Sequence, residues 1–179
     1  MPNISALTDT IFTGLRIFIP VLILLKFTKL FGNRIDIRIL VTATNWLLLF
    51  AATVSLILFT SEIFVSYYSQ NEYEQFAVSN RIFGPYWFTF AIQASIYFLL
   101  PQMMWFKKVK VSIAATMLWA LLAYALIALV YYSEHNGAFI SFSPSTTLLS
   151  YLKSLIIFIA LLAIVYFMLL KRERRLVSK

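Results

Sequence analysis

Three charged side chains lie inside apolar stretches of this sequence, namely Arg16, Glu62 and Lys153. A charge in a membrane interior costs on the order of a few kcal/mol unless it is paired or hydrated, so these residues are candidates for proton or charge transfer. By helix count, all three fall within the outer third of their segments. A cluster in which Arg16 or Lys153 neutralises Glu62 is one interpretation. The alternative is that the two bases extend to the membrane surface and that Glu62 lies among the headgroups.

Uncharged polar residues form two weaker patterns. Polar and small residues recur near helical spacing on the second apolar segment, and Thr89 and Gln93 are four residues apart on the third. The second-segment residues are Thr42, Asn45, Ala52, Thr53 and Thr60. Such patterns are typical of helix contacts in membranes, where small and amide side chains pack and form hydrogen bonds. A polar path or a quinone headgroup site, lined by Asn45 and Gln93, is the alternative.

Other kinds of site lack the residues that they need. The sequence contains no cysteine, which excludes disulfides, iron–sulfur ligation and thiol catalysis by this chain. Its single histidine, His135, lies in a polar loop, which excludes a bis-histidine haem. No metal-spaced cluster, phosphate-binding loop or catalytic triad pattern is evident. We therefore expect no metal and no catalysis by the chain alone, and quinone is the one cofactor that stays a candidate.

The elements that carry these residues are membrane helices. Hydrophobic residues make up 61% of the 179 residues and charged residues only 12%, with a mean hydropathy of +0.85. These values lie outside the range of soluble globular proteins, so we predict an all-α integral membrane protein with a single domain over residues 1–179. The net charge of +8 comes mainly from basic residues at the ends of apolar runs. Such residues contact anionic lipid headgroups, and nucleic-acid binding is not expected.

Five transmembrane helices are predicted, because a bilayer core of ~30 Å requires about 20 apolar residues. Their ranges are about 10–31, 40–68, 83–106, 111–132 and 144–170. Pro85 is placed to open the third helix, where a missing N–H does no harm. Pro101 is placed late in the same helix, so the carbonyl that it leaves without a donor needs a partner from a neighbouring helix.

The distribution of charge predicts the topology. Twelve of the fifteen basic residues fall in the first connection, the third connection and the C-terminal tail. Basic connections remain on the cytoplasmic side, so we predict an N-terminus outside and a cytoplasmic C-terminus in a bacterial inner membrane. The second connection is different, since it carries Glu72, Tyr73, Glu74 and Arg81. We interpret it as an outer loop on which a soluble partner docks.

Two stretches resemble a known family. The runs YSQNEYEQFAVSNRIFGPYWF (68–88) and PQMMWFKKVK (101–110) are similar to the C-terminal half of NrfD/polysulfide-reductase-type membrane subunits. The most similar members are the quinol-oxidising membrane subunits of alternative complex III. Further likeness lies at residues 10–12 and 29–32, at Glu62, and at residues 143–146, which resemble the opening of the last family helix. The resemblance covers roughly residues 10–171.

The resemblance implies a membrane scaffold homologous to half of a quinol-oxidising subunit. In that family the quinone site and the contact with an iron–sulfur subunit belong to an N-terminal helix bundle that has no counterpart in this sequence. Two further positions depart from the family pattern. An Arg-bearing segment of the family is replaced by the apolar residues 125–132, and Tyr97 stands where the family often has Asn.

Three functions follow from these observations. The first is a non-catalytic membrane subunit of a respiratory electron-transport complex, in contact with lipids, other membrane subunits and iron–sulfur or cytochrome subunits. The second is a quinone-binding or proton-conducting subunit that uses Glu62 with Arg16 or Lys153. The third is a small independent transporter, which the lack of an internal repeat disfavours.

Overall fold

A computed structural model of the chain describes residues 2–28, 36–85, 87–135 and 148–177, and all regular elements within them are helical. The α-helices are α1 (Pro2–Thr28), α2 (Ile37–Tyr68), α3 (Glu72–Phe83), α4 (Trp87–Ala94), α5 (Lys107–Lys110), α6 (Ile113–His135) and α7 (Leu148–Val177). Between α4 and α5 the chain forms a π-helix, η2 (Ser95–Leu99), and then a 3₁₀-helix, η3 (Leu100–Trp105). The all-α prediction is thus confirmed for the described residues.

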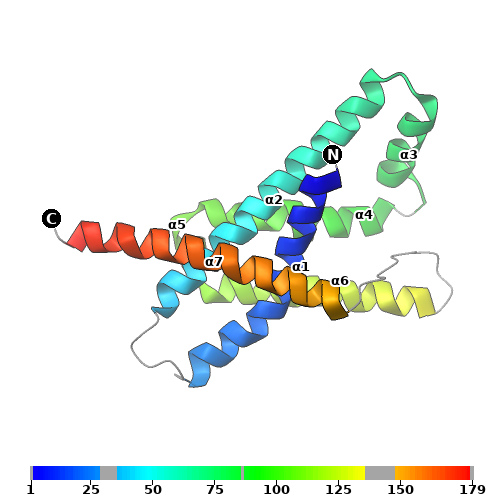
Figure 1. Cartoon of the computed structure of the whole chain (residues 1–179). Helices are drawn as coiled ribbons and strands as arrows, with labels where there is room; N and C mark the ends of the chain where they lie inside the picture. Colours follow the sequence, from blue (N-terminus) through cyan, green and yellow to red (C-terminus); the bar gives the residue numbers. More distant parts are fainter. Residues whose placement is uncertain (1, 29–35, 86, 136–147, 178–179) are drawn as a thin grey trace.

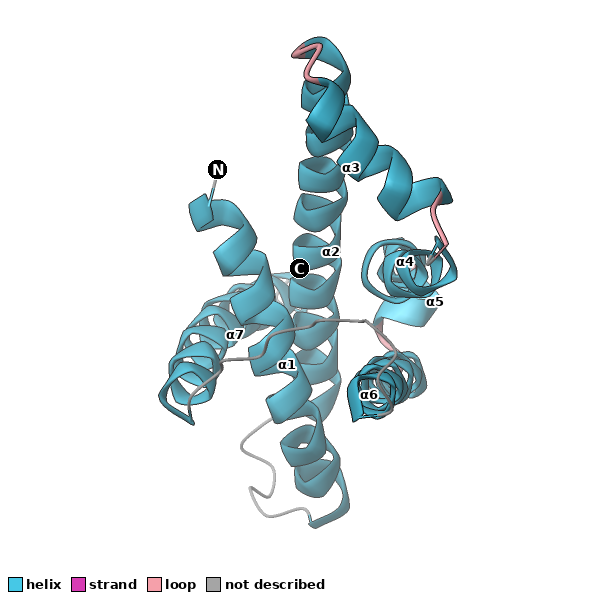
Figure 2. Ribbon diagram, turned by 90° about the vertical axis from the view of Figure 1, so that its right-hand side faces the viewer, coloured by secondary structure: helices cyan, strands magenta, loops and turns pink. Residues whose placement is uncertain are grey.

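Helices α1 and α2 lie at the centre of the molecule (Figure 1). On one side α7 packs against both of them, and on the other side η3, α5 and α6 contact α2. Figure 2 shows α4, α6 and α7 nearly end-on, so these three helices run roughly parallel, whereas α2 crosses them steeply. The long α2 therefore connects the two sides of the bundle.

Within the described residues, three helices are long and apolar enough to cross a membrane. They are Ile4–Leu24 within α1, Ile37–Tyr68, and Ser150–Arg175 within α7. The segments Glu72–Phe83 and Trp87–Trp105 meet the criterion only as a pair bent by 79°, which is a broken span or a re-entrant segment. A shorter apolar helix covers Ile113–Leu129. The architecture is therefore of the membrane type, with three to four candidate spans where the sequence predicts five.

Two helix boundaries of the structure differ from the approximate ranges predicted for the crossings. The first candidate span begins at Ile4 rather than near residue 10, because the helix already includes the polar residues that precede the apolar run. The predicted third crossing, about 83–106, corresponds to α4, η2 and η3 (Trp87–Trp105), and Gly84 and Pro85 precede it at the end of α3. The predicted ends at residues 29–31 and 144–147 lie outside the described residues.

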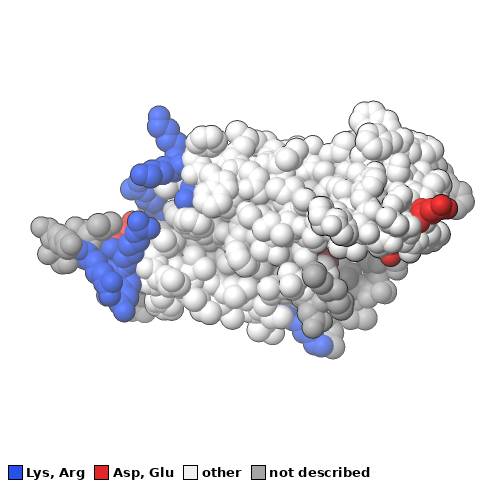
Figure 3. Space-filling view, turned by 90° about the horizontal axis from the view of Figure 1, so that it is seen from above, with Lys and Arg blue, Asp and Glu red and all other residues white. Residues whose placement is uncertain are grey.

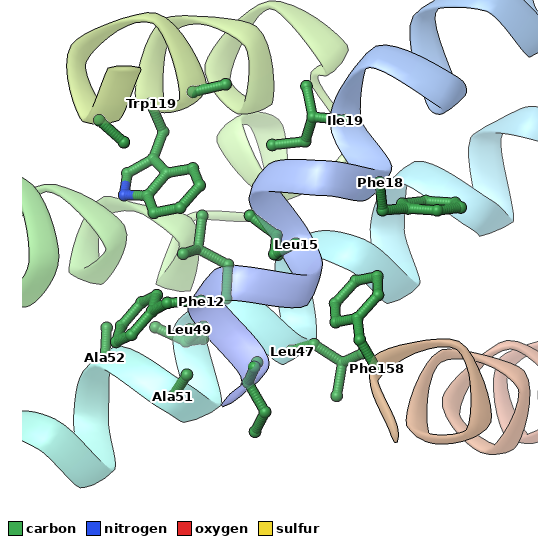
Figure 4. Packing of buried hydrophobic residues seen from close by; sticks show 14 of the residues in the cluster. Phe12, Leu15, Phe18, Ile19, Leu47, Leu49, Ala51, Ala52, Trp119 and Phe158 are labelled. Atoms are coloured by element: carbon green, nitrogen blue, oxygen red, sulfur yellow. The ribbon is translucent and has the colours of Figure 1, made fainter. Parts of the chain in front are cut away.

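The core forms where α1, α2, α6 and α7 meet. Phe12 of α1 stacks on Trp119 of α6 with ring centroids 6.1 Å apart, and Phe18 of α1 lies 5.4 Å from Phe158 of α7. Figure 4 shows Leu15 between these two aromatic pairs. Trp119, Phe158 and Leu15 are fully buried. Helix α1 thus contributes side chains to the core that pack against both α6 and α7.

A glycine allows the close approach of α1 and α7. A Cβ atom built on Gly14 would meet the Cβ atom of Phe158 and would lie 2.7 Å from the carbonyl oxygen of Ser154. The second contact is with backbone, so a side-chain rotation cannot relieve it. Only glycine fits between α1 and α7 at their present separation.

We expect Gly14→Ala to destabilise the protein. The gain in helix propensity of about 0.5–1 kcal/mol is smaller than the cost of overpacking, which is typically about 1–3 kcal/mol. Equilibrium unfolding in detergent micelles would measure the difference, with Ala6→Val, at an exposed position of α1, as the control for added bulk. A Gly14→Ala variant as stable as the wild type would show that α1 and α7 are not closely packed at this point.

Candidate functional site

Glu62 is paired with a residue from the expected docking loop. Arg81 Nη1 on α3 donates to both carboxylate oxygens of Glu62, at 3.1 and 3.2 Å. The two side chains are 48% and 50% exposed, respectively. The structure therefore does not bring Glu62 together with Arg16 or Lys153, and Lys153 is exposed on α7.

The chain turn after α2 explains this pairing. Gln70 has a φ of 53°, a left-handed conformation, and it reverses the chain so that α3 contacts α2. Glu62 lies eight residues before Gln70 and Arg81 lies eleven residues after it, so the two side chains can meet between α2 and α3. The sequence spacing alone does not indicate such a reversal.

We expect Glu62→Gln to lower the free energy of unfolding by less than about 1 kcal/mol, because exposed ion pairs contribute about 0–1 kcal/mol. Chemical unfolding of the detergent-solubilised variant tests this, with Glu173→Gln as a control at another exposed position. A loss of several kcal/mol would instead place Glu62 in a desolvated charge cluster.

Arg16 is the predicted charged residue that lies deepest in a candidate span. It is twelve residues after Ile4 and eight before Leu24, near the middle of the span rather than in its outer third. Its side chain is half-buried, and Nη2 donates to Thr13 Oγ1 at 3.1 Å. The guanidinium therefore needs further polar or charged groups near it.

Asp9 and two tyrosines lie within electrostatic range of Arg16. Asp9 is on the same helix, and Tyr97 and Tyr124 come from η2 and α6. Asp9 and Arg16 are seven residues apart, so they share one face of α1. Asp9 is missing from the candidate residues because the predicted first crossing begins after it. The spacing of opposite charges by two helical turns is the signal that identifies it.

The backbone at Arg16 is also supported by α6. In an α-helix the carbonyl of residue 16 would accept a hydrogen bond from the N–H of residue 20, but Pro20 has none. The hydroxyl of Tyr124 donates to the Arg16 carbonyl instead, at 2.6 Å. A side chain of α6 thus compensates for the proline in α1.

A second proline is compensated in the same way. In η2 the N–H of Leu100 bonds to the carbonyl of Ser95, five residues earlier. The next bond of this pattern would join Pro101 to Ile96, and Pro101 has no N–H. Trp119 Nε1 on α6 donates to the Ile96 carbonyl at 3.0 Å. This confirms the prediction that a neighbouring helix supplies a partner near Pro101, although the sequence did not identify Trp119.

Asn45 connects α2 to the turn between α5 and α6. It is fully buried, and its Nδ2 donates to the carbonyl of Lys110 at 2.7 Å and to that of Ser112 at 3.5 Å. Its Oδ1 accepts a hydrogen bond from Thr116 Oγ1 at 2.7 Å. The next residue, Trp46, lies 3.9 Å from Lys110 Nζ in a cation–π contact. The helix-contact interpretation of Asn45 thus agrees with the structure.

Of the other polar residues, Gln102 makes hydrogen bonds to other side chains, whereas Gln93 and Thr89 make none within the described residues. Gln102 Nε2 donates to Thr53 on α2 at 3.4 Å, and its Oε1 accepts from Trp105 Nε1 at 3.0 Å. Gln93 on α4 is half-buried and makes no hydrogen bond within the described residues. Thr89 Oγ1, one turn earlier, is buried and also has no partner there. Gln93 is therefore not joined to Asn45 in one polar site.

The expected docking loop is a helix. Asn71 Oδ1 caps α3 by accepting from Tyr73 N at 3.1 Å, and Glu72 and Glu74 in the first turn complement the helix dipole. Ser69 Oγ donates to Glu74 Oε2 at 3.1 Å. Since Arg81 is paired with Glu62, two of the four predicted docking residues make contacts within the chain.

Comparison of the chain with protein-family models, curated proteins and solved structures finds no significant match. No group of three or more His, Asp or Glu residues in the described ranges could hold a metal ion. Asn45, Trp119 and Tyr124 join different helical elements by hydrogen bonds from their side chains to backbone carbonyls. Within the described residues, Arg16 is the charged side chain near the middle of a candidate span, and Asp9 lies two helical turns nearer the start of the same span.

Proposed function

We propose that this chain is a non-catalytic membrane subunit that packs within a respiratory redox complex, as one half of an NrfD-type bundle would. The observation that supports this proposal is that three side chains donate hydrogen bonds to backbone carbonyls of other elements, two of them at buried or half-buried positions. These are the bonds of Asn45 to Lys110, of Trp119 to Ile96 and of Tyr124 to Arg16. Interior polar groups used in this way support a scaffold role. The resemblance at residues 68–88 and 101–110 supports the assignment to a redox complex.

We further propose five crossings with the N-terminus outside, in a bacterial inner membrane. Helix α6 has 23 residues. At about 1.5 Å per residue, that length suits a crossing of a hydrocarbon core of ~30 Å. The charge distribution supports this orientation. In Figure 3 most Lys and Arg side chains gather at one end of the molecule, and Asp and Glu lie mainly toward the other end, with uncharged surface between them.

Exposed apolar surface on α6 and α7 supports contact with lipids and with other membrane subunits. The largest exposed apolar side chains on these helices include Leu118, Leu121, Ile156, Ile164 and Phe167. A membrane-embedded partner would pack its own apolar helices against this surface. Iron–sulfur or cytochrome subunits would then belong to the same assembly.

Affinity purification in a mild detergent, with mass spectrometry of the co-purifying proteins, tests the proposed function. The expected result is recovery of iron–sulfur, molybdopterin-dependent or cytochrome subunits in fixed proportion to this chain. Recovery of the chain without any redox subunit, from membranes that contain such complexes, would refute it. An unrelated multi-pass protein with the same tag controls for aggregation.

A quinone-binding or proton-conducting role is the second candidate, and the position of Arg16 near the middle of its candidate span, with Asp9 two helical turns nearer the start of that span, favours it. Glu62 is less suited to this role than the sequence suggests, because it is paired with Arg81 at an exposed position. Quinol oxidation by a purified complex would be compared between Asp9→Asn and Glu62→Gln variants that still assemble. Loss of turnover in Asp9→Asn alone would support proton or charge transfer near Arg16, and normal turnover in both variants would exclude it.

A further inference from the structure

Helix α3 has two faces of different character. Val78, which is 6% exposed, lies on the face that packs against α2, and the Glu62–Arg81 pair holds the same two helices together. Tyr73, Phe76 and Phe83 are spaced by three and seven residues and share another face. Their exposed fractions are 80%, 68% and 80%. An aromatic face of this size on a short helix requires a partner.

The direction of α3 relates this face to the membrane. The axis of Glu72–Phe83 is bent by 79° from the segment Trp87–Trp105, which runs roughly parallel to α6 and α7. If those helices cross the bilayer, α3 lies nearly in the membrane plane at one end of the bundle (Figure 1). A helix in that position, with aromatic residues on one face, is typical of interfacial membrane helices.

Neighbouring residues favour lipid over a charged protein partner. Phe64 and Tyr68 at the end of α2 are also exposed, and their rings stack at 5.2 Å, so the aromatic surface continues onto α2. In contrast, Glu74 and Arg81 are used in contacts with Ser69 and Glu62. The charges that would orient a soluble partner are thus partly neutralised, while the aromatic surface remains open.

We propose that α3 is an interfacial helix whose face of Tyr73, Phe76 and Phe83 inserts into the headgroup region of the leaflet opposite Lys107, Lys108 and Lys110. The ligand of this surface is a zwitterionic phospholipid interface. Glu72 and Glu74 with one Arg give α3 a net charge of −1, which disfavours anionic lipid. This inference requires only the membrane architecture and is independent of the redox assignment.

Single-cysteine spin labelling of the whole chain in phosphatidylcholine liposomes tests the proposal, and no native cysteine has to be removed. Labels at residues 76 and 83 are compared with a label at residue 74, which is also exposed but lies off the aromatic face. Accessibility to oxygen, which concentrates in lipid, and to a water-soluble nickel chelate is measured at each site. The expected result is a severalfold higher ratio of oxygen to nickel accessibility at residues 76 and 83.

Two outcomes would overturn the proposal. Equal ratios at all three sites, with high nickel accessibility, would place α3 in water. Low accessibility to both reagents at residues 76 and 83 would mean that protein, from a second copy of this chain or from another subunit, covers the aromatic face. Neither outcome would affect co-purification with redox subunits, so the proposed function is tested separately.

Discussion

Replacement of Asn45 by alanine is expected to destabilise the protein by about 2 kcal/mol. The variant loses the hydrogen bonds to Lys110, Ser112 and Thr116 at a position that is fully buried. A buried acceptor without a partner costs about 1–3 kcal/mol, whereas one hydrogen bond between membrane helices averages about 0.6 kcal/mol. We expect a loss larger than that of one average bond between membrane helices, because Asn45 makes several hydrogen bonds at one site. Denaturant unfolding in micelles measures the loss.

Thr42→Ala is the matched control for this experiment. Thr42 lies one turn before Asn45 on α2, but its hydroxyl donates only to Arg38 O of the same helix, at 2.8 Å. We therefore expect almost no change in that variant. Asn45→Asp keeps the acceptor for Thr116 and loses both donors, so it separates the two halves of the contact. Equal stability of the Asn45→Ala and Thr42→Ala variants would contradict the contact with the α5–α6 turn.

The second large effect is expected for Trp119→Phe. Phenylalanine keeps an aromatic ring beside Phe12 but removes the N–H that Ile96 O requires. The loss should be about 1–3 kcal/mol, because the carbonyl is left buried without a donor. In a Pro101→Ala background residue 101 gains an N–H that can bond within η2, so the same substitution should cost less there.

The two substitutions therefore form a double-mutant cycle. Contacting residues typically show coupling energies of about 0.5–3 kcal/mol, and we expect a value in that range. The double variant should be more stable than the sum of the two single losses predicts. Unfolding of all four proteins in the same detergent gives the coupling. An equal cost of Trp119→Phe in both backgrounds would show that the indole N–H does not compensate for Pro101.

Features set by local chemistry were accessible from the sequence. The second helix was expected over 40–68 and is observed as Ile37–Tyr68, because a long apolar run specifies its own length. The need for a partner near Pro101 follows from the covalent structure of proline. The role of Asn45 as a helix contact follows from the cost of a free amide in an apolar interior. The start of α3 was not predicted, because the segment was interpreted as a loop, although Asn71 followed by Glu72 and Glu74 is a helix-start signal.

Features that depend on how segments meet in space were not accessible. Trp119 is 23 residues from Ile96, and Tyr124 is 108 residues from Arg16, so no local pattern connects them. The pairing of Glu62 with Arg81 depends on the left-handed Gln70, a residue type that usually avoids this conformation. In each case the need for a partner was predictable, whereas its identity required the tertiary structure.

Native mass spectrometry of the complex that contains this chain tests the proposed function most directly. The chain alone has a mass of 20.7 kDa. If the chain is a scaffold subunit of a redox complex, the complex released from native membranes should contain this chain together with iron–sulfur or cytochrome subunits. Its mass should then equal the sum of the masses of these subunits and not an integer multiple of 20.7 kDa. A species at 20.7 kDa, or at an integer multiple with nothing but lipid bound, would contradict the proposal.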